Sequence, residues 1–279
     1  MFKKLIKVTS LLVLVGFSFF YTEKVTKIAR EKDPIMIKIS DMKESNSVSV
    51  VKPIINNDEY IAGINGCEIN VNESYSKMKS VGEFKEELLV MKEVTNEESV
   101  KNKYIVGGNK VTKNVSIIFL VDDAINDKLI NFLSLKNINA NFFVDGQYLE
   151  KDLVTVKFVA ENNNIYYLGQ NRKYDDDYML YSNNLISMNG KNESKYCLVN
   201  EKNDEILKLC SDYNMNTIKT DFITDNIYKT VKTNLTNGTI FAFDTDDIEE
   251  VKVSINYILS KGYNIVTLDK LLDESNKCD

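Results

Sequence analysis

The chain has 279 residues, of which 43% are apolar and 27% charged, so it can fold as one large domain or two smaller ones. Its net charge of −6 argues against a nucleic-acid-binding surface, and no nucleic-acid partner is expected. The sequence contains no histidine, which excludes any mechanism in which this chain supplies an imidazole as a base or as a zinc ligand.

The N-terminus has the features of an export signal. Lys3, Lys4 and Lys7 precede an uncharged run over residues 8–22. Because basic flanking residues remain in the cytoplasm, the chain beyond this run is predicted to face outward. The run is short for a membrane span, which needs about 20 apolar residues. We expect residues 1–22 to be a retained single-pass anchor in the cell membrane; the alternative is a cleaved signal peptide and a secreted protein.

The rest of the chain divides into segments of different composition. Residues 23–54 are polar and charged with weak periodicity, which is typical of a stalk or linker. Residues 55–112 are mixed and contain glycine turns, so we interpret them as a small N-terminal extension. Residues 113–273 form the main domain, and residues 274–279 are a short tail.

The main domain alternates between strand and helix patterns. Val115–Val121 is an almost continuous apolar run, which is typical of a strand buried on both faces. Residues 127–136 follow with apolar side chains at helical spacing, and residues 139–144 are a second strand. The alternation continues to residue 268. Repeated strand–helix units predict an α/β fold with a mostly parallel sheet, either open or closed into a barrel.

The four cysteines are Cys67, Cys197, Cys210 and Cys278. An exported location permits disulfides. Cys197 precedes a helix predicted at residues 203–213 and Cys210 lies within it, so they face each other across one short segment and are a candidate disulfide; buried free thiols are the alternative. If all four cysteines pair, three connectivities are open.

Three segments of the main domain resemble the polysaccharide deacetylase (NodB-homology) family. V-S-I-I-F-L-V-D-D-A at 115–124 and N-A-N-F-F-V-D-G at 139–146 resemble the strand that ends in T-F-D-D-G and the strand A-T-F-F-V-x-G that open the family's domain. N-G-T-I-F-A-F-D at 237–244 resembles N-G-S-I-I-L-x-H, and K-G-Y-N-I-V-T-L at 261–268 resembles the closing K-G-Y-x-F-V-T-L. The resemblance covers roughly residues 113–273 and implies a distorted (β/α) barrel.

The resemblance also implies a chemistry. The family removes N-acetyl groups from polysaccharides with a divalent metal held by one Asp and two His. The metal lowers the pKa of its bound water and polarises the acetamide carbonyl. A second Asp is the base, and a further His protonates the leaving amine.

Most of these functional positions are substituted in this chain. By resemblance, Asp122 stands at the base position and Asp123 at the position of the Asp ligand. Asn171 and Asp175 stand where the two His ligands belong, and Asp244 replaces the catalytic His.

Three further binding positions are less closely matched. Tyr196 begins the segment that corresponds to the family's R-P-P-Y-G motif, and its Arg is missing here. Asp221 or Asp225 takes the acidic position that polarises the catalytic His.

The substituted positions predict an acidic mouth at the C-terminal ends of the strands. Several carboxylates close together cannot all ionise without a cation. Oxygen ligands suit Ca²⁺, Mg²⁺ or Mn²⁺ better than zinc. We therefore expect either no cofactor or a divalent cation bound by oxygen ligands, and we do not expect zinc. Alternatively, these aspartates cap helices or lie solvated in loops.

Three functions follow as hypotheses. The first is a membrane-anchored pseudoenzyme that binds cell-envelope glycan such as peptidoglycan, which the missing histidines favour. The second is a divalent-metal-dependent N-deacetylase of envelope polysaccharide. The third is a structural or partner-binding surface protein whose residues 55–112 carry the interaction. Four tyrosines are interpreted as packing or half-exposed surface residues, with stacking on sugars as the alternative: Tyr166, Tyr167, Tyr174 and Tyr178.

Overall fold

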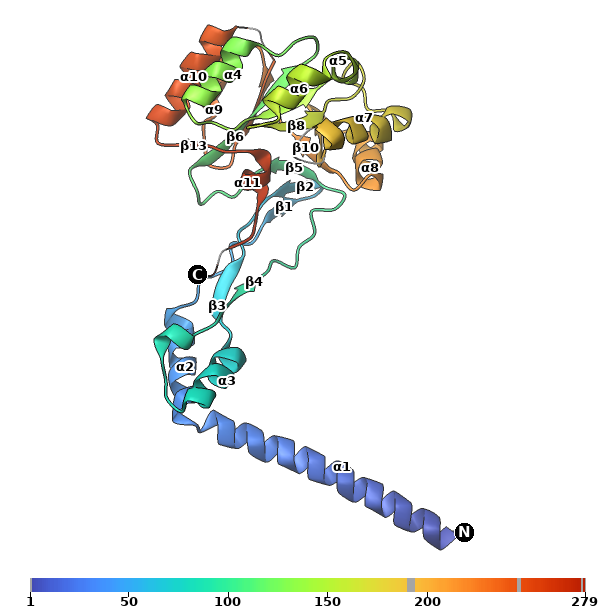
Figure 1. The fold of residues 1–279 in the computed structure, drawn as a ribbon, viewed down its shortest axis with the longest axis vertical. Helices are drawn as coiled ribbons and strands as arrows, with labels where there is room; N and C mark the ends of the chain where they lie inside the picture. Colours follow the sequence, from blue (N-terminus) through green and yellow to red (C-terminus); the bar gives the residue numbers. More distant parts are fainter. Residues whose placement is uncertain (1, 190–193, 245–246, 277, 279) are drawn as a thin grey trace. The chain divides into compact units, whose positions relative to one another are not determined.

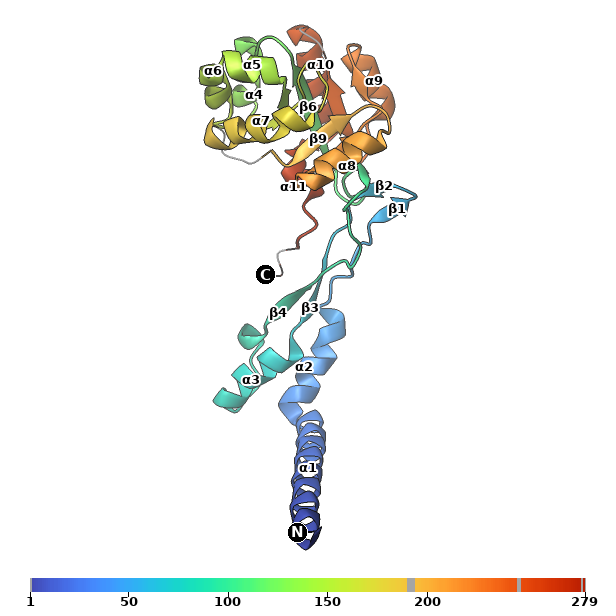
Figure 2. The ribbon, with the colours of Figure 1, turned by 90° about the vertical axis from the view of Figure 1, so that its right-hand side faces the viewer.

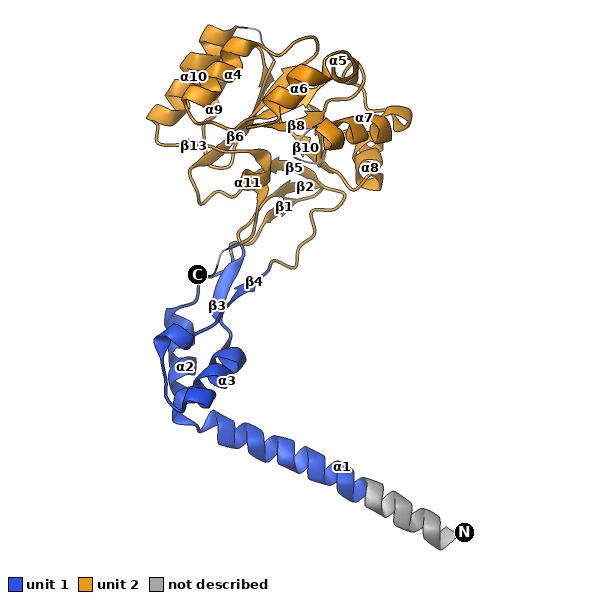
Figure 3. Ribbon diagram, in the orientation of Figure 1, with its two compact units in different colours: residues 1–50, 65–95, 276–279 blue, residues 51–64, 96–275 orange. Residues whose placement is uncertain are grey.

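The computed structural model describes residues 2–189, 194–244, 247–276 and 278, with residues 2–12 described by their backbone alone. The chain forms two compact units that are interleaved in sequence (Figure 3). Unit 1 comprises residues 1–50, 65–95 and 276–279, and unit 2 comprises residues 51–64 and 96–275. The segment 55–112, which we interpreted as one small extension, is therefore divided between the two units.

Unit 1 consists of helices and one hairpin. Its helices are α1 (Phe2–Glu31), α2 (Pro34–Ser45), α3 (Val71–Val81) and a 3₁₀ turn at Glu86–Leu88. Its antiparallel hairpin joins β3 (Gly66–Ile69) to β4 (Met91–Val94). Ile39, Ile69 and Met78 form its buried core. Among the described residues, we find no helix with the length and apolar character that a membrane crossing requires.

Unit 2 contains two hydrogen-bonded sheets (Figure 1). The first sheet has the order β1-β2-β5-β10-β9 and is parallel apart from the β1–β2 hairpin. Its strands are β1 (Ile54–Asn56), β2 (Glu59–Ile61), β5 (Tyr104–Gly107), β10 (Asn216–Lys219) and β9 (Tyr196–Val199).

The second sheet of unit 2 is entirely parallel. Its order is β11-β12-β6-β7-β8, and β13 also pairs with β6. Its strands are β11 (Ile223–Thr224), β12 (Ile240–Phe243), β6 (Asn114–Val121), β7 (Asn141–Val144), β8 (Asn164–Tyr167) and β13 (Asn264–Ile265).

Apart from α11, which follows the last strand, the helices of unit 2 connect strands and lie outside them (Figures 1 and 2). Several begin at a side-chain cap, as Asn203 shows by accepting the N–H groups of Glu205 and Ile206. The helices are α4 (Asp127–Leu135), α5 (Gly146–Lys151), α6 (Leu153–Val159), α7 (Asp176–Asn189), α8 (Asp204–Asp212), α9 (Ile227–Asn234), α10 (Ile248–Ser260) and α11 (Leu268–Leu272).

Alternate residues of the parallel strands face two different cores. Ile118 and Phe143 belong to an inner core that also takes Leu198 and Ile218 from the first sheet. The side chains on the other face of these strands, such as Phe142, pack against the helices in a second core. Both faces of these strands are thus buried, which confirms the prediction made from the apolar run of β6. The α/β class with mostly parallel strands is also confirmed.

Two disulfides are present, one local and one long-range. Cys197 in β9 is bonded to Cys210 in α8, with a Cα–Cα distance of 6.4 Å, and this is the candidate pair identified from the sequence. Cys67 is bonded to Cys278 within unit 1, a pairing that the sequence left open. Structural disulfides persist in oxidising compartments, so both bridges indicate a location outside the cytoplasm.

Candidate functional site

The fold brings Asp122 and Asp244 to the same edge of the second sheet. Asp122 directly follows β6, and Asp244 directly follows β12. These strands are parallel neighbours with Phe243 opposite Phe119, so their carboxyl ends meet at the same edge. Asp123 also follows β6, and its side chain is exposed.

Arg172 lies between these two carboxylates and binds both. Its Nε donates to Asp122 Oδ1 at 2.8 Å, and its Nη2 donates to Asp122 Oδ2. Its Nη1 and Nη2 donate to the two carboxylate oxygens of Asp244, each at 2.7 Å. Four of the five N–H donors of the guanidinium are therefore directed at carboxylate oxygens. Such paired, charge-assisted bonds fix the geometry more firmly than a single contact does.

A tight turn after β8 places Arg172 in this position. Gln170 and Lys173 exchange backbone hydrogen bonds of 2.8 and 3.0 Å, with Asn171 and Arg172 between them. The φ angles of Asn171 and Arg172 are 51° and 60°, a left-handed conformation that two-residue hairpin turns require. Asparagine tolerates this region well, whereas arginine enters it at a cost.

Buried Asp145 binds the backbone of this turn. Its Oδ2 accepts the backbone N–H of Arg172 at 3.1 Å, and its Oδ1 accepts the N–H of Gln147 at 2.9 Å, which caps α5. The side chain is 4% exposed. A buried carboxylate with these partners holds the backbone of the turn in one place.

These contacts determine the electrostatics around Arg172, Asp122 and Asp244. Hydrogen bonds to Asp244 first, and then to Asp122, raise the pKa of the Arg172 guanidinium above its usual value. The side chains of Arg172, Asp122 and Asp244 are 39%, 43% and 34% exposed, so water screens the attraction in part. Both carboxylates are nevertheless occupied as hydrogen-bond acceptors of Arg172.

The remaining predicted ligand positions have other surroundings. Asn171 is exposed in the turn. Asp175 accepts the N–H of Asp177 at 2.8 Å, at the start of α7, which is the helix-capping alternative that we had considered. Among the described residues, no group of three or more His, Cys, Asp or Glu side chains is arranged to hold a metal ion. The donor set therefore does not fit the metal of the deacetylase chemistry.

Of the three further candidates, Asp225 lies at the same sheet edge as the carboxylate pair. It directly follows β11, whose Thr224 lies opposite Phe243 and accepts the N–H of Asp244 at 3.0 Å. Tyr196 and Asp221 have other partners. Tyr196 is buried, and its hydroxyl donates to Asp269 at 3.1 Å. Asp221 pairs with Lys219 at 2.7 Å, and Asp225 is exposed.

The candidate stacking tyrosines are mostly core residues. Tyr166 and Tyr167 are fully buried, which confirms packing for these two and rules out the alternative that they line a sugar-binding lip. Tyr174 donates to the carbonyl of Tyr167 at 3.1 Å and accepts from the N–H of Leu198 at 2.7 Å. Of the four, Tyr178 is the most exposed, at 42%.

A cavity of about 380 Å³ adjoins Arg172. This volume lies within the range of small-molecule sites. Its apolar lining is Leu120, Leu168, Tyr174, Leu198, Val199, Ile206 and Ile223. Its polar lining is Arg172, Asn200, Glu201, Lys202 and Asn203. The cavity therefore combines an apolar surface with hydrogen-bonding and charged groups.

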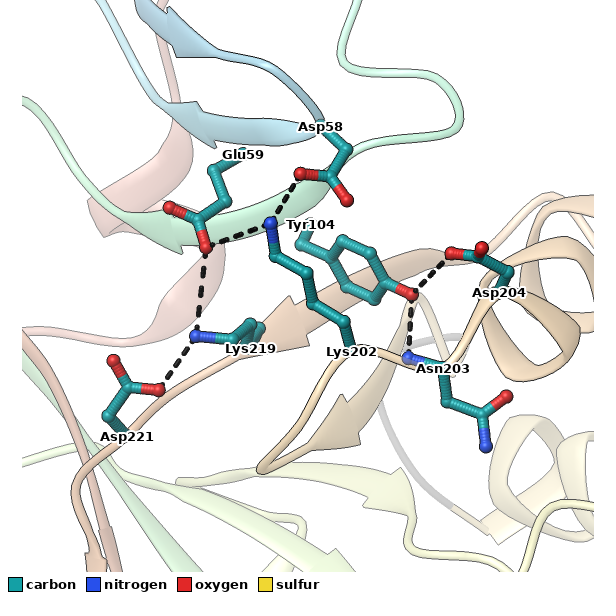
Figure 4. Close-up of polar contacts among 8 residues, drawn as sticks. All are labelled: Asp58, Glu59, Tyr104, Lys202, Asn203, Asp204, Lys219 and Asp221. Carbon is teal, nitrogen blue, oxygen red and sulfur yellow. Dashed lines mark hydrogen bonds and ion pairs between the residues drawn. The ribbon is translucent and has the colours of Figure 1, made fainter.

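Ion pairs fix the position of Lys202, which lines this cavity (Figure 4). Lys202 contacts Asp58, and it contacts Glu59 at 3.3 Å. Glu59 also reaches Lys219 at 3.7 Å. These pairs tie the β1–β2 hairpin to β10 and to the loop after β9.

The uncharged side chain of Tyr104 in β5 also contacts the loop that carries Lys202 and Asn203 (Figure 4). Its hydroxyl donates to Asp204 at 3.3 Å and accepts the N–H of Asn203 at 2.7 Å. The loop between β9 and α8 is thus anchored at Lys202 and Asn203.

Sequence reasoning missed Arg172 and Lys202. One signal for Arg172 was available, because it is one of two arginines in the chain and lies inside the segment where the family's metal ligands belong. Lys202 had no such signal, since its partners lie far away in the sequence.

No protein-family model matches the sequence. The chain is 29% identical over 107 residues to the uncharacterized protein YlxY of Bacillus subtilis (strain 168), a match that covers 37% of this chain and 34% of that protein. The matched region thus spans about a third of the length of this curated relative.

Several solved structures are similar to this one. BA3943, a CE4 family pseudoenzyme from Bacillus anthracis, superposes with a TM-score of 0.63 at 18% identity, covering 88% of this chain and 97% of that one. A BA3943 mutant with restored enzymatic activity gives a TM-score of 0.64 at 19% identity, with coverages of 88% and 100%.

Two further solved structures have a similar fold. PdaA of Bacillus subtilis, a family 4 carbohydrate esterase, has a TM-score of 0.51 at 15% identity, covering 62% of this chain and 85% of that one. The peptidoglycan N-acetylglucosamine deacetylase Bc1960 has a TM-score of 0.53 at 18% identity, with coverages of 62% and 95%. The resemblance seen in the sequence is confirmed at the level of the fold: the chain has the polysaccharide deacetylase, or CE4, fold.

Proposed function

We propose that this protein is a non-hydrolytic member of the CE4 fold, a distorted (β/α) barrel, that binds cell-envelope glycan on the outer side of the cell membrane. The observation that carries the proposal is an open cavity beside two carboxylates that are both bound to Arg172. A glycan can bind in the cavity, and the contacts of Arg172 occupy the two residues that stand at the positions for catalysing hydrolysis.

The contacts of Arg172 argue against hydrolysis. Acetamide hydrolysis needs a base that activates water, an acid that protonates the leaving amine, and a polarised carbonyl. Asp122 stands at the base position, but both of its oxygens accept hydrogen bonds from Arg172. Both oxygens of Asp244, at the acid position, are also occupied. Each of the four carboxylate oxygens therefore accepts a hydrogen bond from Arg172, so Arg172 competes with water and substrate for both residues.

The lining of the cavity supports a sugar as the ligand. Leu168, Leu198 and Ile223 present apolar surface, which suits the C–H face of a pyranose ring or an acetyl methyl group. Asn200 and Glu201 present polar groups to hydroxyls. Bc1960, of the same fold, is a peptidoglycan N-acetylglucosamine deacetylase, so peptidoglycan is the first glycan to test.

The proposed location rests on the N-terminal segment and the disulfides. Lys3, Lys4 and Lys7 before the uncharged run support an orientation with the N-terminus inside. The two disulfides fit an oxidising exterior. We propose that the segment anchors the protein in the membrane, and cleavage as a signal peptide is the alternative.

A paired variant tests glycan binding. Asn200→Trp places a bulky ring at the exposed rim of the cavity, and Asn162→Trp places the same ring at an exposed site in a different cavity. We expect the wild type and Asn162→Trp to co-sediment with insoluble peptidoglycan, and Asn200→Trp to lose this binding. Retained binding by Asn200→Trp would show that the cavity is not the glycan site.

Acetate release from peptidoglycan and chitooligosaccharides tests the absence of hydrolysis. We expect no release above the rate without protein, with or without added divalent metal. Release by the wild type at an ordinary enzymatic rate, roughly 1 s⁻¹ or faster, would overturn the non-hydrolytic assignment.

A further inference from the structure

Asp122 and Asp244 form a carboxylate pair that needs a positive partner. Both accept hydrogen bonds from the same Nη2 atom of Arg172, so their oxygens lie on either side of one nitrogen. Two carboxylates so close repel each other unless a positive charge lies between them. Hard divalent cations and a guanidinium are two alternative ways to supply that charge. We infer that Arg172 is an internal cation that supplies the positive charge between Asp122 and Asp244 and closes this position to metal ions.

The backbone around Arg172 is built to deliver the guanidinium. Asn171 and Arg172 both adopt the left-handed conformation. Buried Asp145 binds the N–H of Arg172. Gly169 has a φ of 95°, and a Cβ at this position would lie 2.6 Å from the carbonyl oxygen of Lys173. An incidental surface ion pair would need none of these three constraints, so the placement of Arg172 is specified by the fold.

The shape of the guanidinium matches the pair better than an ammonium would. Arg172 presents one edge to Asp122 through Nε and Nη2 and another to Asp244 through Nη1 and Nη2. A lysine ammonium at this site is a single point charge and cannot bind both carboxylates in this planar, bidentate way. The site therefore depends on arginine and not merely on positive charge.

Removing Arg172 should uncover a cation site. We propose to measure Mn²⁺ and Ca²⁺ binding, each ion alone, by calorimetry and by thermal shift on the full chain. Arg172→Ala is expected to bind about one cation per chain, with an affinity at least about tenfold above that of the wild type. Asp122→Asn and Asp244→Asn, added to Arg172→Ala, should abolish this gain. Lys173→Ala changes the neighbouring residue of the same turn and should behave as the wild type.

Two results would overturn the inference. One is equal cation binding at Asp122 and Asp244 in the wild type and in Arg172→Ala. The other is a folded Arg172→Ala protein that gains no cation affinity. If Arg172→Ala alone does not fold, the same inference predicts that adding Asp122→Asn and Asp244→Asn restores folding, because the uncompensated charges are removed. A triple variant that remains unfolded would then contradict it.

Discussion

At the scale of single residues, Arg172 binds Asp122 and Asp244 at the edge where β6 and β12 end. The meeting of Asp122 and Asp244 could be expected, because residues that follow neighbouring parallel strands share one edge of a sheet. The occupation of both by Arg172 could not be expected. It depends on a turn whose conformation is set by Asp145, from another strand–helix connection, and such distant support leaves no local pattern in the sequence.

Asp145→Ala should weaken the turn and the start of α5 together. The buried carboxylate serves the N–H groups of Arg172 and Gln147, so its removal leaves both without this acceptor. We expect the free energy of unfolding to fall by about 1–2 kcal/mol, the usual cost of a lost helix cap. Urea denaturation measures the change. Asp123→Ala, at an exposed neighbouring aspartate, is the control and should change stability by less than about 0.5 kcal/mol. Equal stability of the two variants would contradict the role given to Asp145.

At the scale of elements, strong local signals predicted the structure and weak ones did not. The apolar run of β6 and the Asn203 cap of α8 are local features, and both elements lie where they were expected. Strands β2 and β5 are short, and they join the first sheet by pairing with residues far along the chain. Local periodicity carries no information about such pairing. Helix α2 lies in the segment interpreted as a linker, although Asp33 followed by Pro34 is a recognisable helix start.

The start of α2 predicts a pH dependence. A hydrogen bond from Lys79, followed by those from the Ile35 N–H and the Tyr75 hydroxyl, holds the pKa of Asp33 below its ordinary value. A carboxylate with a lowered folded-state pKa stabilises the fold above its unfolded pKa, about 3.9. That contribution is lost as the pH falls through the lower folded-state value.

Hydrogen exchange of the α2 amides measures this contribution. Opening of α2 should become easier as the pH falls below about 4, and Asp33→Asn should reduce protection at neutral pH and flatten the dependence. Asp41→Asn, within the same helix, is the control for a simple loss of charge. The same pH dependence in Asp33→Asn as in the wild type would contradict the assignment to Asp33.

At the scale of the whole molecule, the sequence predicts the fold of residues 113–273 but not the division of the chain into two units. The alternating pattern and the resemblance cover only that region. The two units are interleaved, and unit 1 takes the C-terminal residues 276–279 through contacts with residues far earlier in the chain. Asn276 donates its N–H to Glu93 at 2.6 Å and its side-chain amide to Asn65 at 3.0 Å. Long-range contacts of this kind follow from the fold and not from local sequence.

The Cys67–Cys278 disulfide should stabilise unit 1 selectively. The bridge holds the C-terminal residues against the β3–β4 hairpin, and a disulfide that closes a long loop typically contributes about 2–5 kcal/mol. In Cys67→Ser/Cys278→Ser, we expect amides of unit 1 to lose hydrogen-exchange protection while those of β6 and β7 keep theirs. Cys197→Ser/Cys210→Ser is the matched control and should affect β9 and α8 instead. Equal losses in both units would contradict a local role for the bridge.

The most direct test of the central claim is a crystal structure of the purified protein grown with excess Mn²⁺. The quantity to measure is anomalous scattering between the carboxylates of Asp122 and Asp244. We predict no manganese peak there and a guanidinium of Arg172 bonded to both carboxylates. A manganese peak between Asp122 and Asp244, with Arg172 turned away, would contradict the account.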